Sequence, residues 1–247
     1  MKTQTPFLPI LIAAAMAGSA HAALYLGNGS TGFGGPIGTG SLQVTDDGTN
    51  LSFTLTRGTA ALNDTFVIYF DSAAGGATAL PNSGEIGSPF VGRRAVVNEF
   101  GSDLTFGSGF SSDFAFALKV NGSASNHLFT TPSGVNANTA TFITTAAVSN
   151  FGNATAATYS WTIPLSSLDL TLGETFDFHT TYLNPNGGDG SDASFRSNEA
   201  MVNSMGASSP GFGAVTLSSP LSYTVTPEPG VAILGSLGFL MLLRRRK

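Results

Sequence analysis

Residues 65–71, TFVIYFD, are the stretch that decides the fold. Successive side chains of a β-strand point to opposite faces. Phe66 and Phe70 would therefore share one face with Ile68, while Tyr69 would point to the other. A strand that is apolar on both faces has to be covered on both sides. The sequence therefore predicts a buried, central strand.

A two-residue apolar period recurs along most of the chain. It runs up to and away from an Asp-Gly turn at Gly48, which is a β-hairpin signal. Only residues 164–168 could make a helical turn, and the thirty-one glycines favour many turns. The sequence predicts an all-β fold, a single antiparallel, jelly-roll-like β-sandwich. Further strands are expected over residues 42–44, 51–55, 114–118, 128–129, 142–148, 155–163, 174–183, 214–217 and 221–225.

The N-terminal end has the pattern of a secretory signal peptide. A lone early charge and the apolar residues 7–18 precede Ala20 and Ala22, which form a small-x-small cleavage site. The signal would span residues 1–22 and engage the Sec translocon and signal peptidase. Cleavage would make Ala23 the first residue of the mature chain.

The C-terminal residues 227–247, PEPGVAILGSLGFLMLLRRRK, hold three parts in order. Pro-Glu-Pro is rigid and non-helical, because proline fixes φ and lacks a backbone donor. Residues 230–243 carry no charge, and a basic cluster follows them. As a helix they would span roughly 21 Å, short of the ~30 Å hydrocarbon core, with the basic end held in the cytoplasm. This pattern predicts a short anchor that is removed later.

This tail closely resembles the PEP-CTERM sorting signal of Gram-negative bacteria. In that family an exosortase in the inner membrane recognises the tail and cleaves near the Pro-Glu-Pro. The products are surface proteins of organisms that make exopolysaccharide or biofilm matrix. The resemblance implies transient anchoring in the inner membrane, then delivery to the cell envelope or outer surface, or secretion. It rests on the apolar run and on Pro227, Glu228, Pro229, Arg244, Arg245 and Arg246.

The body between these ends, residues 23–226, is acidic and lacks cysteine. It has five basic and fourteen acidic residues, for a net charge near −9. Nucleic-acid binding needs Lys and Arg gathered on one face, so we expect no nucleic-acid partner. Without cysteine there is no disulfide, thiol nucleophile or cysteine-bound metal. A core rich in phenylalanine must hold the body together.

Three segments of the body, residues 42–56, 64–76 and 159–184, occur in a familiar order. They resemble the β-sandwich of DOMON domains and family 9 carbohydrate-binding modules. Those domains tend to have a hairpin, then a central strand ending in Asp (here Asp71), then an edge like residues 163–168, IPLSSL. The resemblance implies a body that binds polysaccharide, with exopolysaccharide as the expected partner. It carries over no binding residue.

Sugar recognition usually needs an exposed aromatic ring framed by polar side chains. Tyr182, beside an Asn-Pro-Asn loop, and Trp161 are the candidate ligand-binding residues. Trp161 alternates with Tyr159 and Ile163 on one strand face, which is also how a core stripe looks.

Structural calcium is the only cofactor that the sequence suggests. Asp189 and Asp192 lie in a long loop, and Asp46 and Asp47 offer oxygens in the hairpin. Calcium takes six to eight oxygen ligands, which flexible Asp/Asn/Gly loops can supply. Asp-Gly loops are also ordinary turn chemistry that needs no metal.

The expected function is non-enzymatic. His127 and His179 lie in different strand regions, and Asp177 and His179 would share a wetter face of one strand. No nucleophile elbow, HExxH or P-loop is present. A secreted hydrolase of glycans or esters stays open as the alternative, and would need clustered acids or a His pair in one cleft. A self-assembling adhesive protein would need a long, flat, unpaired edge strand.

Overall fold

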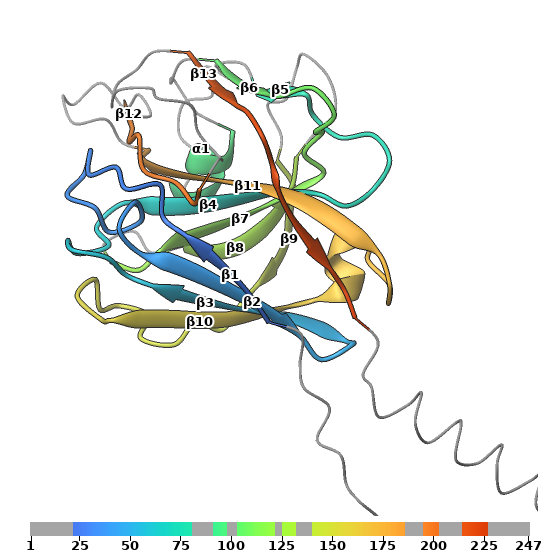
Figure 1. The fold of residues 1–247 in the computed structure, drawn as a ribbon, viewed down its shortest axis with the longest axis horizontal. Coiled ribbons are helices and arrows are strands. Elements are labelled where there is room, and N and C mark those ends of the chain that lie inside the picture. The colour runs from blue at the N-terminus through green and yellow to red at the C-terminus, as the bar shows by residue number, and fades with distance from the viewer. Residues whose placement is uncertain are drawn as a thin grey trace, which may run out of the picture. The chain divides into compact units, whose positions relative to one another are not determined.

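The chain forms an all-β, sandwich-like fold, as the sequence predicts, and Figure 1 shows it in a computed structural model. The structure describes residues 22–80, 91–97, 103–121, 125–131, 140–185, 195–202 and 214–226. All of these belong to one unit, Ala20–Pro227.

The first sheet has four antiparallel strands in the order β1-β2-β3-β10. The predicted hairpin at Gly48 joins β2 to β3, and Gly48 has a φ of 77°. Strand β10 comes about 100 residues later and pairs with the far side of β3. The bounds are β1 Ala22–Leu26, β2 Ser41–Asp46, β3 Asn50–Thr56 and β10 Thr158–Pro164.

The second sheet has seven strands, in the order β12-β11-β4-β7-β8-β9, with β14 also paired to β11. Strands β12 and β14 pair with different ends of the ten-residue β11. The bounds are β4 Thr65–Asp71, β7 Phe114–Lys119, β8 Ser125–Thr130, β9 Phe142–Thr145, β11 Thr175–Asn184, β12 Phe195–Arg196 and β14 Leu221–Thr224.

A smaller layer covers the outer face of the second sheet. It consists of α1 and the sheet β13-β6-β5, in which β13 and β6 run parallel. The all-antiparallel expectation is therefore wrong at this pair. The bounds are β5 Ala79–Leu80, α1 Val91–Val96, β6 Leu104–Phe106 and β13 Val215–Leu217, and the predicted helical turn is a 3-10 helix, η1, at Leu165–Leu168.

Strand β4 is central and apolar on both faces, which confirms the buried, central strand predicted for residues 65–71. Phe66 and Phe70 join the core between the two large sheets. Val67 and Tyr69 join a second core beneath the smaller layer. Because two cores depend on it, β4 is the strand around which the layers are arranged.

The smaller layer also overturns the expectation that His179 shares a wet face of β11, although Asp177 on that face is half-buried and Thr175 is exposed. His179 is fully buried, and its ring lies 4.5 Å from Phe110 and 6.0 Å from Phe106 between centroids. This face of β11 would be exposed to water only if no other element packed on it. The elements of the smaller layer that do so are too short to be predicted from the sequence. Strands of two or three residues show hardly any alternation.

A buried carboxylate holds the loop between β1 and β2. Glu199 is fully buried, and its Oε1 accepts the amides of Phe33 at 2.6 Å and Gly35 at 3.1 Å. Its Oε2 accepts the amides of Ile37 at 3.0 Å and Gly38 at 3.1 Å. Four backbone donors thus replace the water that the charge would otherwise require.

The two ends of the described body lie at the same end of the sandwich. Ala22 pairs with Thr45 on β2. Thr226 donates through its backbone amide to Asp46, the next residue of β2, at 3.3 Å. Figure 1 shows β1 beginning and the chain after β14 ending close together.

Several predictions concern residues outside the described ranges. These are the signal peptide up to His21, the sorting segment 227–247 with its predicted apolar helix, and the calcium candidates Asp189 and Asp192. Ala22 and Ala23, which flank the predicted cleavage site, are the first two residues of β1. Within the described ranges, no helix is long and apolar enough to cross a membrane.

Candidate functional site

The outer face of the four-stranded sheet carries hydroxyl and amide side chains in register. Each apolar residue of β2, β3 and β10 points inward, so the alternate residue points outward. Strand pairing aligns these outward residues in three rows of three. We call this surface the hydroxyl face; its rows are Ser41, Thr56, Thr158, then Gln43, Thr54, Ser160, then Thr45, Ser52, Thr162.

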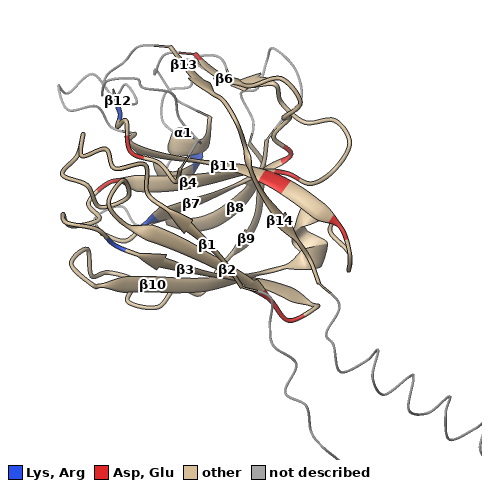
Figure 2. Cartoon of the chain, viewed as in Figure 1, with Lys and Arg blue, Asp and Glu red and all other residues tan. Residues whose placement is uncertain are grey.

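None of the nine side chains carries a charge. Figure 2 shows β2, β3 and β10 in tan along their middle, with charged residues near their ends. Arg57, which follows β3, turns its guanidinium to backbone carbonyls, including those of Ala60 at 2.5 Å and Ala156 at 3.0 Å. The hydroxyl face therefore offers hydrogen bonds without electrostatic attraction to an ion.

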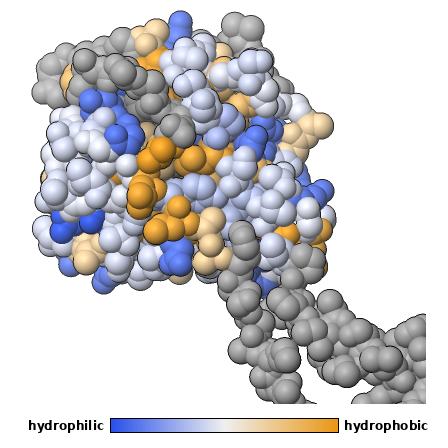
Figure 3. All heavy atoms as spheres, viewed as in Figure 1, coloured by the Kyte–Doolittle hydropathy of each residue, from blue (hydrophilic) through white to orange (hydrophobic). Residues whose placement is uncertain are grey.

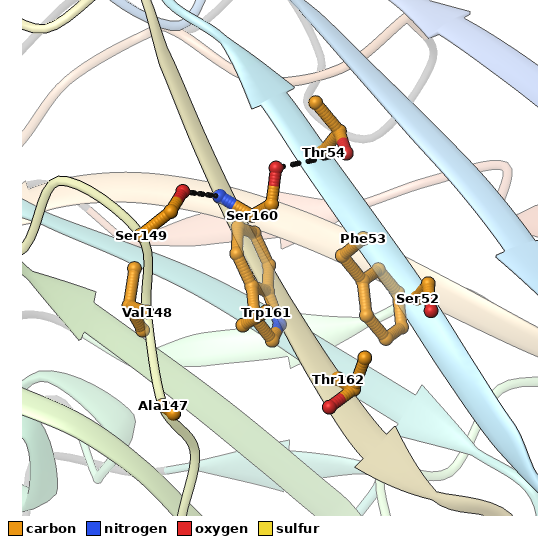
Figure 4. A pocket seen from close by; sticks show the side chains of 9 residues that line it. All are labelled: Ser52, Phe53, Thr54, Ala147, Val148, Ser149, Ser160, Trp161 and Thr162. Carbon is orange, nitrogen blue, oxygen red and sulfur yellow. Dashed lines mark hydrogen bonds between the residues drawn. The ribbon is translucent and has the colours of Figure 1, made fainter.

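An open groove of about 470 Å³ lies on this face beside β10 (Figure 4). Small-molecule sites usually have volumes of about 300–1,000 Å³. The groove is bordered by the outward residues of β3 and β10 and by the segment that follows β9. Its lining residues are Ser52, Phe53, Thr54, Ala147, Val148, Ser149, Ser160, Trp161 and Thr162.

Ser160 fixes the position of the groove wall. Its backbone amide donates to Ser149 Oγ at 2.7 Å, and its carbonyl accepts the Ser149 amide at 2.9 Å. Its hydroxyl pairs with Thr54 Oγ1 at 3.1 Å across the strands. Figure 4 shows these side chains converging at one end of the groove. The wall and the hydroxyls are thus held together before any ligand arrives.

Trp161 borders the groove but does not present its ring to it. The side chain is 2 % exposed and stacks between Phe53 and Phe116, at centroid distances of 5.4 and 5.1 Å. Its ring belongs to the core between the large sheets. As a stacking platform for sugar, Trp161 is therefore corrected to a core residue.

Tyr182 is also a core residue. It is fully buried, its hydroxyl accepts the Asp64 amide at 2.9 Å, and its ring packs edge-on against Phe33. Burial raises the pKa of its phenol far above the ordinary value. Its place near a loop suggested exposure, but the loop between β1 and β2 covers it. Tyr182 thus offers no free ring face.

Exposed apolar side chains lie elsewhere, where sequence reasoning did not place them. Leu24 and Leu26 of β1 are 63 % and 58 % exposed, and they extend the rows of the hydroxyl face. Figure 3 shows an orange patch where Figure 1 draws β1. Phe142 on β9 is 49 % exposed and contacts His127 edge-on at 5.5 Å. Their signal was weak, because each also fits a core alternation.

Acidic residues gather at one end of the second sheet. Burial raises the pKa of Asp71, and neighbouring Asp113 and Asp177 add to the rise, opposed by the hydrogen bond from the Ser111 amide at 2.8 Å. Asp113 accepts the Ser72 amide at 3.0 Å. Among the described residues there is no group of three or more His, Asp or Glu placed to hold a metal ion.

The hairpin aspartates are occupied by the protein itself. Asp47 accepts the amides of Thr49 at 2.9 Å and Asn50 at 2.7 Å, and these bonds lower its pKa. Asp46 accepts the Tyr223 hydroxyl at 2.6 Å. The bonds of Asp47 are ordinary turn chemistry, whereas the bond of Asp46 ties the hairpin to β14.

The two histidines of the body are not brought together. His127 is on β8 and His179 on β11, with β4 and β7 between them, which is about 14 Å of sheet. His127 Nδ1 lies 3.0 Å from Ser125 Oγ, but Ser125 is 1 % exposed because α1 packs over it at Gly92. Burial lowers the pKa of His127. This serine is not open to a substrate.

The two edge strands of the four-stranded sheet, β1 with five residues and β10 with seven, are partly paired. On β1, the Leu26 carbonyl accepts the Val202 amide at 2.7 Å. On β10, Ser149 pairs with Ser160, and Asn150 Nδ2 donates to the Thr158 carbonyl at 2.9 Å. These edges do not form the long, flat strand that edge-to-edge assembly needs.

No family model matches this chain, and neither does any curated protein or solved structure.

Proposed function

We propose that this chain is an exported surface or matrix protein whose body binds neutral polysaccharide through the hydroxyl face. It resembles PEP-CTERM proteins: the signal is cut after Ala22, residues 230–243 hold the chain transiently in the inner membrane, and an exosortase processes it near Glu228. The protein then reaches the cell envelope, the outer surface or the medium. It acts by binding and not by catalysis.

The observation that carries the binding proposal is that the side chains of the hydroxyl face are uncharged and aligned across three strands. Sugar hydroxyls donate and accept hydrogen bonds, and so do nine aligned Ser, Thr and Gln side chains. Leu24 and Leu26 add apolar contact at the border, where the apolar faces of sugar rings can lie. Each contact is weak in water. The ligand that suits such a face is therefore a polymer, which repeats the contacts many times.

The sorting proposal is supported by where the body ends. Ala22 pairs with Thr45, and Thr226 donates a hydrogen bond to the next residue, Asp46. The described body therefore begins and ends at the same end of the sandwich. That arrangement suits a precursor whose two apolar segments enter one membrane.

The proposal that the sandwich is jelly-roll-like is supported by the places where the chain crosses from one large sheet to the other. The chain passes from the first sheet to the second between β3 and β4, returns between β9 and β10, and crosses again between β10 and β11. Such exchanges between two packed sheets are what a jelly-roll-like sandwich requires.

Replacing Pro227, Glu228 and Pro229 together by alanine should block processing. The precursor is then expected to stay in the inner membrane at its unprocessed mass. Cell fractionation and intact mass measure both properties. A control replaces Pro164, which is at the end of β10, by alanine and should leave processing unchanged. Normal mass and surface location in the triple variant would refute the sorting proposal.

Removing one hydroxyl pair from the groove should weaken glycan binding. Thr54→Ala with Ser160→Ala deletes the pair at 3.1 Å and should lower affinity for a neutral glucan about tenfold. The matched control deletes the pair of Thr175 and Thr224, 2.7 Å apart on the other sheet. Affinity electrophoresis in glucan gels measures the change, and equal effects of both double variants would argue against this face.

A further inference from the structure

Asp46 holds the last residue before the sorting motif. Its side chain is almost buried, and Oδ2 accepts the Tyr223 hydroxyl at 2.6 Å. The same oxygen accepts the Thr226 amide and the Thr226 hydroxyl, each at 3.3 Å. We call these contacts the Asp46 latch. In the sequence, Pro227 follows Thr226 directly.

The residue before Thr226 is held equally firmly. Val225 is fully buried in the main core. Its amide donates to the Glu174 carbonyl and its carbonyl accepts the Gly173 amide, both at 2.8 Å. The chain is therefore part of the fold up to the residue that precedes the motif.

An enzyme that recognises an extended peptide through its main chain needs free backbone groups on that peptide. Next to Pro227, both backbone groups of Val225 and the backbone amide of Thr226 are paired within the fold. They become accessible only when the end of β14 opens locally, without unfolding of the rest. The stability of the latch sets how often this happens.

We propose that Asp46 is a positioning residue for processing, which keeps Val225 and Thr226 folded and so slows cleavage of the C-terminal segment. This role rests on the proposed sorting function. It would let a folded body stay membrane-bound for a defined time before release.

Tyr223→Phe in the chain 1–247 tests this role with little risk to folding. It removes one of the bonds to Asp46 and should speed processing several-fold in a pulse-chase experiment, while Asp46→Ala should speed it about tenfold. The matched control is Tyr159→Phe, which removes the bond from another buried tyrosine to the Asn153 carbonyl at 2.7 Å. Its processing rate should equal that of the wild type.

Hydrogen exchange separates the latch from general instability. The amides of Val225 and Thr226 should exchange faster in Tyr223→Phe than in the wild type. In Tyr159→Phe their exchange rates should equal those of the wild type. If exchange rises but processing does not, the role of Asp46 is refuted while the sorting function stands. If the wild-type chain is never processed, the sorting function fails and the role of Asp46 fails with it.

Discussion

Replacing Glu199 by alanine is expected to lower the free energy of unfolding by at least about 4 kcal/mol. The carboxylate accepts four backbone amides of the loop between β1 and β2, and it is fully buried. Hydrogen bonds to a charged group contribute about 1.5–3 kcal/mol each. Alanine would leave four donors without an acceptor and would open a cavity beneath the loop.

Urea unfolding followed by circular dichroism measures this loss. Glu199→Gln should cost less than alanine, because the amide keeps one accepting oxygen. The control is Glu174→Ala, since Glu174 is exposed and its side chain accepts a hydrogen bond from the Thr171 amide at 2.5 Å. A Glu199→Ala protein about as stable as the Glu174→Ala protein would contradict the buried-carboxylate account.

Replacing Trp161 by alanine should cost about 3–5 kcal/mol, the usual range for a large buried aromatic side chain. The indole fills the core between Phe53 and Phe116, with interplanar angles of 9° and 17°. Its buried Nε1 has no hydrogen-bond partner among the described residues. Trp161→Phe removes no hydrogen bond and should therefore cost clearly less.

Glucan binding separates the two roles that Trp161 could have. Because its ring points into the core, folded Trp161→Phe protein should bind glucan as the wild type does. Loss of binding in that variant, at unchanged melting temperature, would restore Trp161 as a ligand-binding residue.

Much of the fold could be predicted from local patterns. Strand β4 was recognisable because its residues are apolar on both faces, and the β2–β3 hairpin because alternation surrounds an Asp-Gly turn. Helix α1 could not be recognised, since its six residues, VGRRAV, depend on packing against β7 and β8. Gly92 shows this, as any side chain there would collide with Ser125.

The candidate site was predictable only in its parts. Alternation indicates that Thr54 and Ser160 point outward, but nothing local indicates that their strands are neighbours. Strand order depends on contacts between distant segments of the chain. Tyr182 was predicted to be exposed because it lies beside a loop, but a second loop covers it. That loop contributes Phe33, about 150 residues earlier in the chain, which no local pattern could indicate.

The most direct test of the binding proposal is co-sedimentation of residues 23–226, which lie within the unit Ala20–Pro227, with insoluble neutral glucan and with exopolysaccharide of the producing bacterium. It is done with and without calcium, at low and high salt, beside the Thr54→Ala, Ser160→Ala double variant. We predict saturable pelleting that high salt does not abolish, because the hydroxyl face is uncharged. The double variant should pellet with lower affinity than the wild type. No pelleting in any condition, or pelleting that high salt abolishes, would contradict the proposal that the hydroxyl face binds neutral polysaccharide.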